Sequence, residues 1–359
     1  TMMKNERLYL DVHVVQTVPP SCINRDDTGS PKTAVYGGVT RARVSSQSWK
    51  QAMRGMFRET LPETVLGVRT KKIVDMVADA IRQIEANDEA EDLAEKILKT
   101  AGLKISSAQD GTGALFFMSR SQAEALAFLA LEDGEPSKTQ AQKAIREAPG
   151  VDVALFGRMV ADSKALNVDA SAQVAHSLST HKVANEYDYF TAVDDMSPED
   201  SAGAGHIGTV EFNSATLYRY ATLAVHELQK ELPDGAAQAA RAFVDAFVRS
   251  MPTGKQNTFA NRTLPDAVMV CLRADQPINL VGAFESPVKA GENGYSAASV
   301  ERLGKHARQV YADFADEPGL ALLAGRGLEA LGEPQPFKVL LDQLEGEVKA
   351  FLEKTEGQA

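Results

Sequence analysis

The sequence predicts an α+β protein with a ferredoxin-like core that carries insertions. Residues 7–15 alternate, with Leu8, Leu10 and Val12 on one face, as in a strand that is covered on one side. Residues 46–58 instead space their apolar side chains as an amphipathic helix does. A strand and a helix thus precede a long insertion, and a hairpin, a second helix and a strand follow it. That order is compatible with a ferredoxin-like core.

Turn-forming and capping residues delimit the first elements. Pro19-Pro20 is expected to stop the first strand, and residues 21–32 form a polar loop. Gly37-Gly38 bends the chain between two short strands. Ser45 or Ser46 then caps the amphipathic helix, which ends near residue 58.

The later elements follow from the same periodicities. They are expected to be a helical, acidic insertion at 62–148, a mostly helical run at 152–183, a β-hairpin with a long mobile tip at 187–212, a helix at 239–249, a strand at 267–272 and a helical tail beyond 296.

The composition is that of an ordinary soluble protein, with 44% hydrophobic and 24% charged residues among 359. Nothing approaches the ~20 consecutive apolar residues of a membrane span, and the first residues lack the apolar core of a signal peptide. Cys22 and Cys271 are too few for a disulfide framework and lack the spacing of a metal site. We therefore expect a cytoplasmic protein with no membrane partner and no cofactor.

Positive charge is concentrated in one segment. Residues 25–58 carry seven basic and two acidic residues in a chain of net charge −11, which leaves −16 for the rest. Such a segment is expected to hold a polyanion, although a solvated helix face is the alternative. Arginine offers phosphate a planar fork and lysine a movable charge, and a helix N-terminus adds N–H donors. The predicted phosphate site is bracketed by Arg41, Arg43, Lys50 and Arg54, with Ser45, Ser46 and Gln47 as neutral donors.

Paired carboxylates suggest a different chemistry. Asp26-Asp27 and Asp194-Asp195 suit a metal-dependent nuclease, because two carboxylates can hold Mg²⁺ against a scissile phosphate. Adjacent aspartates in turns also act as caps and solvated acids. Gly203, Gly205 and Gly208 have the spacing of a dinucleotide-binding fingerprint, but they lead into a strand instead of a helix, which argues against nucleotide binding.

Aromatic and apolar side chains are candidates for contact with bases. Tyr9 and His13 share one face of the first strand and would stack on bases if that face were open. Phe190 and Val193 lie on the expected hairpin, where they would wedge between bases or dock on a neighbour if exposed. If buried at the base of the hairpin, they belong to the core, and the sequence leaves both alternatives open.

A series of short blocks runs in order across residues 8 to about 285. The longest are Pro20-Ser-Cys-Ile-Asn-Arg-Asp-Asp27, Lys32-Thr-Ala-Val-Tyr-Gly-Gly38 and Arg41-Ala-Arg-Val-Ser-Ser-Gln-Ser-Trp-Lys50; the others are 157–159, 175–181, 190–195, 205–208, 218–220, 254–256 and 268–270. Together they resemble the backbone subunit of the type I-E CRISPR Cascade complex, the CasC family. The helical insertion and the C-terminal tail match least.

The resemblance implies a hand-shaped protein. Its palm would have an RNA-recognition-like, ferredoxin-like fold, its fingers would be the helical insertion, and its thumb would be the β-hairpin. The implied segments are palm 1–60 and 216–295, fingers 61–180, thumb 181–215 and a C-terminal helical segment 296–359.

The resemblance also implies a function without catalysis. Several copies would stack as a filament along the CRISPR RNA, in a ribonucleoprotein for antiviral defence, and present this guide for pairing with a target DNA strand. Further partners would be the large, small and guide-end-capping Cascade subunits. The guide backbone would meet Arg25, Lys32, Arg41, Arg43, Ser45, Gln47, Lys50, Arg54, Lys255 and Gln256, and the kinked nucleotide would meet Met159, Phe190 and Val193.

Two other functions stay open at this stage. Related filament subunits of type III effectors cut target RNA through a loop aspartate, so Asp26 or Asp27 would make this chain a metal-dependent ribonuclease. A small-molecule phosphate-binding enzyme is the third interpretation, but the chain has no intact phosphate-loop motif.

Overall fold

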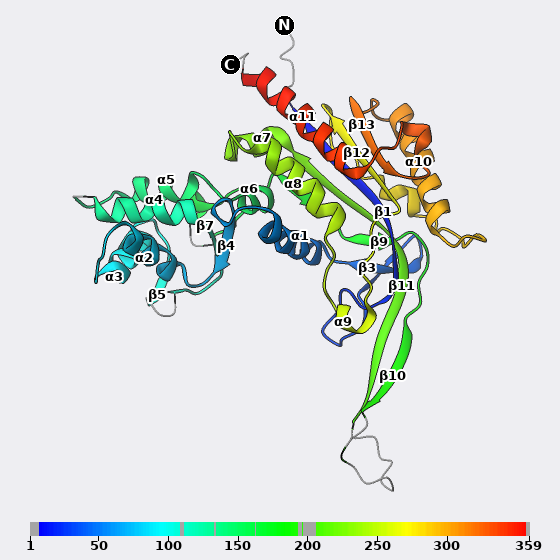
Figure 1. The fold of residues 1–359 in the computed structure, drawn as a ribbon, viewed down its shortest axis with the longest axis horizontal. Coiled ribbons are helices and arrows are strands. Elements are labelled where there is room, and N and C mark those ends of the chain that lie inside the picture. The colour runs from blue at the N-terminus through cyan, green and yellow to red at the C-terminus, as the bar shows by residue number, and fades with distance from the viewer. Residues whose placement is uncertain are drawn as a thin grey trace.

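The computed structural model describes residues 7–107, 111–132, 134–161, 163–192, 196 and 206–356. Within these residues the chain forms a mixed α+β structure with an antiparallel sheet of nine strands and eleven α-helices. Figure 1 shows three parts: a sheet body, a helical lobe to one side of it, and a long hairpin that projects from it. The predicted α+β class is confirmed.

Strand β1 (Tyr9–Ser21) lies at the centre of the sheet. It pairs antiparallel with β11 (His206–Ala224) along one edge and with β12 (Ala267–Arg273) along the other. The strand order is β13-β12-β1-β11-β9-β3-β2, and β8 and β10 pair with β11 outside this path. The other strands of the sheet are β2 (Thr33–Tyr36), β3 (Val39–Val44), β8 (Ala172–Val174), β9 (Ser177–Ser179), β10 (Glu186–Ala192) and β13 (Leu320–Gly325).

Helices cover both faces of the sheet. One face packs against α1 (Ser46–Thr60) and α8 (Ala236–Arg249), with α7 (Val225–Glu231) and α11 (Phe337–Glu356) beside them. The other face packs against α10 (Ser296–Asp313) and the turns before it. The expectation of a strand covered on one side is therefore wrong. His13 points to the second face and is only 1% exposed, so it is not available to stack on bases.

The two prolines do not stop β1 as predicted. The strand continues through Pro19-Pro20 to Ser21, and its register with β11 shifts after Val18. Proline has no N–H for the ladder, so it is tolerated where the pairing is irregular.

A polar network lies beneath β1 on the face covered by α10. The Asp11 carboxylate accepts a hydrogen bond from the Tyr220 hydroxyl and another from the backbone N–H of Ile278, both at 2.8 Å. Burial raises the pKa of Asp11 to about 6, against the smaller opposing effect of these hydrogen bonds. Burial also lowers the pKa of His13 to about 3, so this histidine is neutral. The network ties the loop after β12 to the sheet.

Replacing Asp11 by Asn is expected to stabilise the protein at pH 7. The amide can still accept from Ile278 and donate to the Tyr220 oxygen, and it carries no charge to desolvate. Because the folded-state pKa lies above the unfolded value, wild type loses stability as the pH rises from about 4 to 6. The free energy of unfolding of Asp11→Asn minus that of wild type should grow from near zero at pH 3.5 to about 3 kcal/mol at pH 7. Urea unfolding across this pH range measures it, and a difference independent of pH would contradict it.

The helical lobe has a hydrophobic core of its own, formed by buried side chains between Ile73 and Leu166. Its elements are β4 (Gly67–Thr70), α2 (Ile73–Ile84), α3 (Ala90–Thr100), β5 (Ile105–Ser107), β6 (Gly111–Thr112), β7 (Phe116–Ser119), α4 (Arg120–Leu131) and α5 (Lys138–Arg146). The chain returns to the sheet through α6 (Val151–Phe156). Four α-helices lie among the described residues of 62–148 as predicted, but the same segment also holds the short strands β4, β5, β6 and β7. The mostly helical run at 152–183 is wrong, because β8 and β9 lie there and pair with β11.

The arms of the predicted hairpin are confirmed. Strand β10 pairs with residues 206–212 of β11, and Figure 1 shows this ribbon extending away from the body. Val193, Asp194-Asp195, Gly203 and Gly205 lie outside the described residues.

The C-terminal segment is not wholly helical. Strand β13 interrupts it between α10 (Ser296–Asp313) and α11, and extends the sheet beyond β12. Neither these helices nor any other helix among the described residues is long and apolar enough to cross a membrane.

Candidate nucleic-acid interface

Helix α1 carries the centre of the predicted site, and its start follows the predicted cap. The Ser45 hydroxyl accepts from the Ser48 N–H at 3.4 Å, while the Ser45 N–H donates to the Asn24 side chain at 2.9 Å. Ser45 is buried and its hydroxyl caps the helix, so its contact with an RNA backbone stays a prediction.

The inner face of α1 is fixed by Trp49. The indole is fully buried, donates to the Ser177 hydroxyl at 2.9 Å, and lies 3.7 Å from the guanidinium carbon of Arg219. Arg219 also stacks on Phe247 and donates to Gln16. Burial lowers the pKa of Arg219 to about 9. A buried cation between two aromatic rings thus joins α1, α8 and the sheet.

The outer face of α1 separates two clefts of about 770 Å³ each. The first, which we call the lobe cleft, lies between α1 and the helical lobe. The second, which we call the loop cleft, lies between α1 and two loops, residues 23–29 and 250–254. Gln51 and Arg58 line both clefts.

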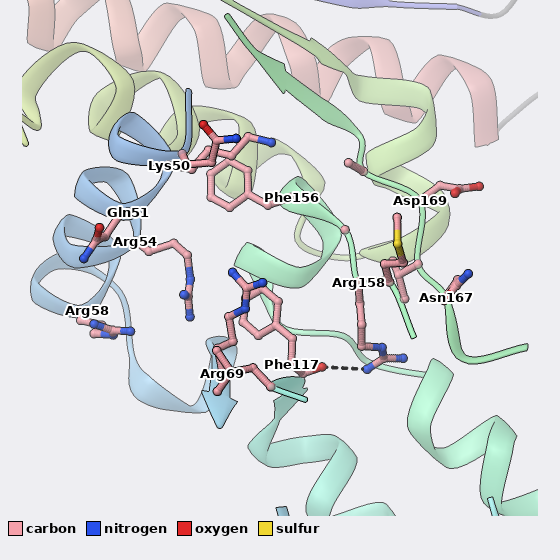
Figure 2. Close-up of a pocket in the computed structure, with 16 residues that line it drawn as sticks. Lys50, Gln51, Arg54, Arg58, Arg69, Phe117, Phe156, Arg158, Asn167 and Asp169 are labelled. Carbon is pink, nitrogen blue, oxygen red and sulfur yellow. Dashed lines mark hydrogen bonds between the residues drawn. The ribbon is translucent and has the colours of Figure 1, made fainter. Parts of the chain in front are cut away.

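Charge distinguishes the two clefts. Five basic side chains and one acidic side chain line the lobe cleft: Lys50, Arg54, Arg58, Arg69, Arg158 and Asp169. Three of each kind line the loop cleft: Arg25, Arg58, Arg262, Asp26, Asp27 and Glu59. Figure 2 shows Lys50, Arg54 and Arg58 along α1, with Arg69 below them beside Phe117. The lobe cleft is therefore the one that suits a polyanion.

Lys50 and Met159, which were both predicted to lie near a guide, line the lobe cleft. The Lys50 ammonium lies 5.5 Å from the centre of the Phe156 ring, and partial burial lowers the pKa of Lys50. Met159 is 89% exposed and projects from the loop after α6. Gln47 is exposed at the N-terminal end of the same cleft.

Arg54 lines the lobe cleft but is not a free cation. Its Nε donates to the Asp152 carboxylate at 2.9 Å, and its guanidinium lies 4.4 Å from the centre of the Phe117 ring. The structure thus gives Arg54 a partner that its sequence position did not indicate.

Arg41 is fully buried and faces neither cleft, so the structure gives no support to its predicted contact with the guide backbone. Its guanidinium donates to the backbone carbonyls of Tyr36, Ser179, Phe284 and Glu285. These bonds hold the β2–β3 turn against the segment before α10, where the tight packing of Gly37 on the Glu285 carbonyl leaves no room for a Cβ.

The remaining predicted cations form two groups outside the lobe cleft. Lys32 and Arg43 lie beside His176, whose pKa is lowered by burial and then by these two charges. Arg25 and Lys255 are both close to Cys22, because Gly254 packs on the backbone of Ile23. Gln256 follows, exposed, at the start of the short helix α9 (Gln256–Phe259).

The hairpin residue Phe190 is 45% exposed and covers Gly208 on the opposite strand. A Cβ at Gly208 would lie 2.5 Å from the Phe190 ring, so the ring would have to shift to make room for one. Val193 lies outside the described residues.

Four cations of the clefts were not predicted from the sequence as site residues: Arg58, Arg69, Arg158 and Arg262. Arg58 repeats the four-residue spacing of Lys50 and Arg54, and that spacing was a sufficient signal for it. Arg69 and Arg262 come from β4 and from the loop before β12, where no local pattern marks them.

Of the two aspartates that the ribonuclease alternative would use, Asp26 and Asp27, the first forms the hydrogen bonds of a turn. Asp26 Oδ1 accepts from the N–H and hydroxyl of Thr28 and from the N–H of Ser30, at 2.7–3.0 Å. These bonds, with that from the Thr28 hydroxyl foremost, hold the pKa of Asp26 below its usual value. Across the part of the chain that the structure describes, no three His, Cys, Asp or Glu side chains are grouped as metal ligands.

The fold and the lobe cleft define an α+β protein with a surface suited to a polyanion. The sequence pattern of the CT1975-like protein family matches residues 10–345, and the chain belongs to that family. No curated protein matches the chain.

Two solved structures are similar over nearly the whole chain. A chain of a "CRISPR RNA-guided surveillance complex, pre-nicking" is 34% identical, with a TM-score of 0.82 and coverage of 95% of this chain and 100% of that one. A chain of a "CRISPR RNA-guided surveillance complex" is 30% identical, with a TM-score of 0.64 and coverage of 94% and 99%.

Proposed function

We propose that this protein is a non-catalytic guide-RNA-binding subunit of a type I-E CRISPR surveillance complex. Several copies stack along the CRISPR RNA and present it for pairing with target DNA. Its partners are the guide, the target strand, further copies of itself and the other subunits of the complex. The observation that carries the proposal is the lobe cleft, where Lys50, Arg58 and Arg69 lie with a single acid, Asp169, in a chain similar to chains of CRISPR RNA-guided surveillance complexes.

The chemistry of the cleft supports binding of the RNA backbone and not of particular bases. Lys50, Arg58 and Arg69 offer charged donors, and Gln47 and Gln51 offer neutral ones. Such side chains contact phosphate and sugar whatever the sequence, as a subunit that accepts any guide requires.

The architecture supports the assignment of palm, fingers and thumb. The strand order β12-β1-β11-β9, with α1 and α8 on one face, supports the assignment of a ferredoxin-like palm. The helical lobe corresponds to the fingers and the projecting hairpin to the thumb. On this assignment Phe190 lies on the thumb and Met159 beside the guide.

The RNA that the protein retains is the direct test. The chain is co-expressed with its guide and partner subunits, the complex is treated with nuclease, and the protected RNA is sequenced. Guide of spacer length, protected at a regular interval, is expected. Random cellular RNA, or none, would reject the proposal.

The absence of cleavage is tested separately. Assembled complex is incubated with Mg²⁺ and RNA complementary to the guide, and intact RNA is expected. Regularly spaced cuts that disappear in Asp26→Asn or Asp27→Ala would instead establish the ribonuclease alternative. Asp26→Asn is preferred to alanine, because its amide oxygen can still accept the hydrogen bonds of the turn.

A further inference from the structure

The helical lobe joins the sheet body through a narrow neck. The chain enters the lobe at Leu66 and Gly67 and leaves it at Gly150, and these two crossings touch. A Cβ on Gly150 would lie 2.5 Å from the Gly67 nitrogen, and a Cβ on Gly67 would lie 2.7 Å from the Phe117 ring. The backbone of one crossing therefore packs directly on that of the other, and a side chain larger than glycine does not fit at either position.

One carboxylate connects the neck to α1. Asp152 Oδ1 accepts from the Gly67 N–H at 2.7 Å, and its Oδ2 accepts from Arg54 Nε at 2.9 Å. The Asp152 side chain is 4% exposed and the Arg54 side chain 15%. Arg54 also lies over the Phe117 ring of β7. Three elements, α1, β4 and α6, thus converge on a single buried acid.

We propose that Arg54 and Asp152 are positioning residues that latch the lobe to α1 and so set the width of the lobe cleft. This inference rests on the proposed function, because the cleft between these two parts is the site assigned to the guide. The latch also neutralises Arg54, since a nearly buried carboxylate already compensates its charge. The cations that meet phosphate are then Lys50, Arg58 and Arg69.

The salt dependence of binding separates a latch from a ligand. For single-stranded nucleic acid each phosphate contact contributes about 0.7 to the slope of log K against log salt. Lys50→Gln is expected to lower that slope by about 0.7. Arg54→Gln is expected to weaken binding several-fold while leaving the slope at its wild-type value. The probe is a labelled single-stranded guide RNA of spacer length, titrated with the full chain between 50 and 300 mM salt.

Arg54 would be a phosphate ligand, and the latch hypothesis wrong, if Arg54→Gln lowered the slope as much as Lys50→Gln does. Asp152→Asn gives the converse result. The asparagine has one acceptor oxygen, which stays with the Gly67 N–H, and its amide group cannot accept from Arg54. Arg54 is then free to turn toward the cleft, and the slope of log K against log salt is expected to rise by about 0.7.

A second readout needs no RNA. Hydrogen exchange of the Gly67 and Val68 amides is expected to be about tenfold faster in Asp152→Asn and Arg54→Gln. Each variant removes the Arg54–Asp152 hydrogen bond that closes the neck, and its loss makes local opening more frequent. Lys50→Gln is the matched control and should exchange as wild type does. Unchanged exchange in both neck variants would overturn the latch.

If wild type fails to bind guide, the proposed function fails, while the exchange experiment still decides whether the latch exists. Should Asp152→Asn not fold, Arg54→Gln alone carries both readouts.

Discussion

The double variant Lys50→Glu with Arg69→Glu is expected to lose guide RNA while remaining folded. The two side chains come from different elements that line the lobe cleft, α1 and β4, so an RNA strand bound along the cleft is expected to contact both. Each contact is a charge-assisted hydrogen bond of about 1.5–3 kcal/mol, and glutamate adds repulsion, so affinity should fall at least 100-fold, or by about 3 kcal/mol. Filter binding with labelled guide at 0.15 M salt measures the loss, and circular dichroism checks the fold.

A matched control has the same change in charge at a distance from the cleft. Lys338 and Lys354 are exposed on α11, and Lys338→Glu with Lys354→Glu should bind guide nearly as wild type does. Equal losses in the two double variants would mean that net charge matters and the lobe cleft does not. Arg54 is left unchanged in this test, because a glutamate there would face the buried Asp152 and confuse binding with stability.

Replacing Trp49 by Ala is expected to have the largest effect on stability, about 3–5 kcal/mol in the free energy of unfolding. The substitution empties a fully buried site, leaves the Ser177 hydroxyl without its donor, and removes one of the two rings that flank Arg219. A buried cation that loses an aromatic partner adds to the cost of the cavity. Denaturant unfolding measures the change.

Two further variants test the origin of that loss. Trp49→Phe keeps an aromatic ring against Arg219 but not the hydrogen bond, and should lose less stability than Trp49→Ala. Val339→Ala, at an exposed position of α11, should change the free energy of unfolding by less than about 0.5 kcal/mol. A loss below about 1 kcal/mol for Trp49→Ala would show that the Trp49–Arg219 stack does not anchor α1.

Local signals in the sequence were enough to predict α1 and the hairpin. A serine cap and an apolar stripe specify α1, and the stripe residues Trp49, Met53 and Phe57 are all buried. Residues four apart share a helix face, so the sequence predicted that Lys50, Arg54 and Arg58 lie on the polar side of that helix. This is the side that lines the lobe cleft. What the sequence determined was the direction of each side chain relative to its own element.

The partners of those side chains could not be predicted, because they come from distant parts of the chain. Arg41 and Lys50 are both cations near the start of α1, yet one is buried by carbonyls from residues 179, 284 and 285 while the other lines a cleft. Arg54 meets an acid 98 residues away. Likewise, the second face of β1 is covered by a helix from the last third of the chain, so alternation in residues 7–15 could not show it.

The central position of β1 has a consequence for the order of folding. Its hydrogen-bonding partners begin at His206 and Ala267, so β1 leaves the ribosome long before either of its edges can be paired. At about 5–20 residues per second, the delay is roughly 10–40 s for the nearer partner alone. The helical lobe, whose core lies within residues 73–166, can form during that interval. A nascent chain therefore carries a finished lobe beside an unpaired apolar strand, which is the state that chaperones bind and that aggregates when synthesis outpaces them.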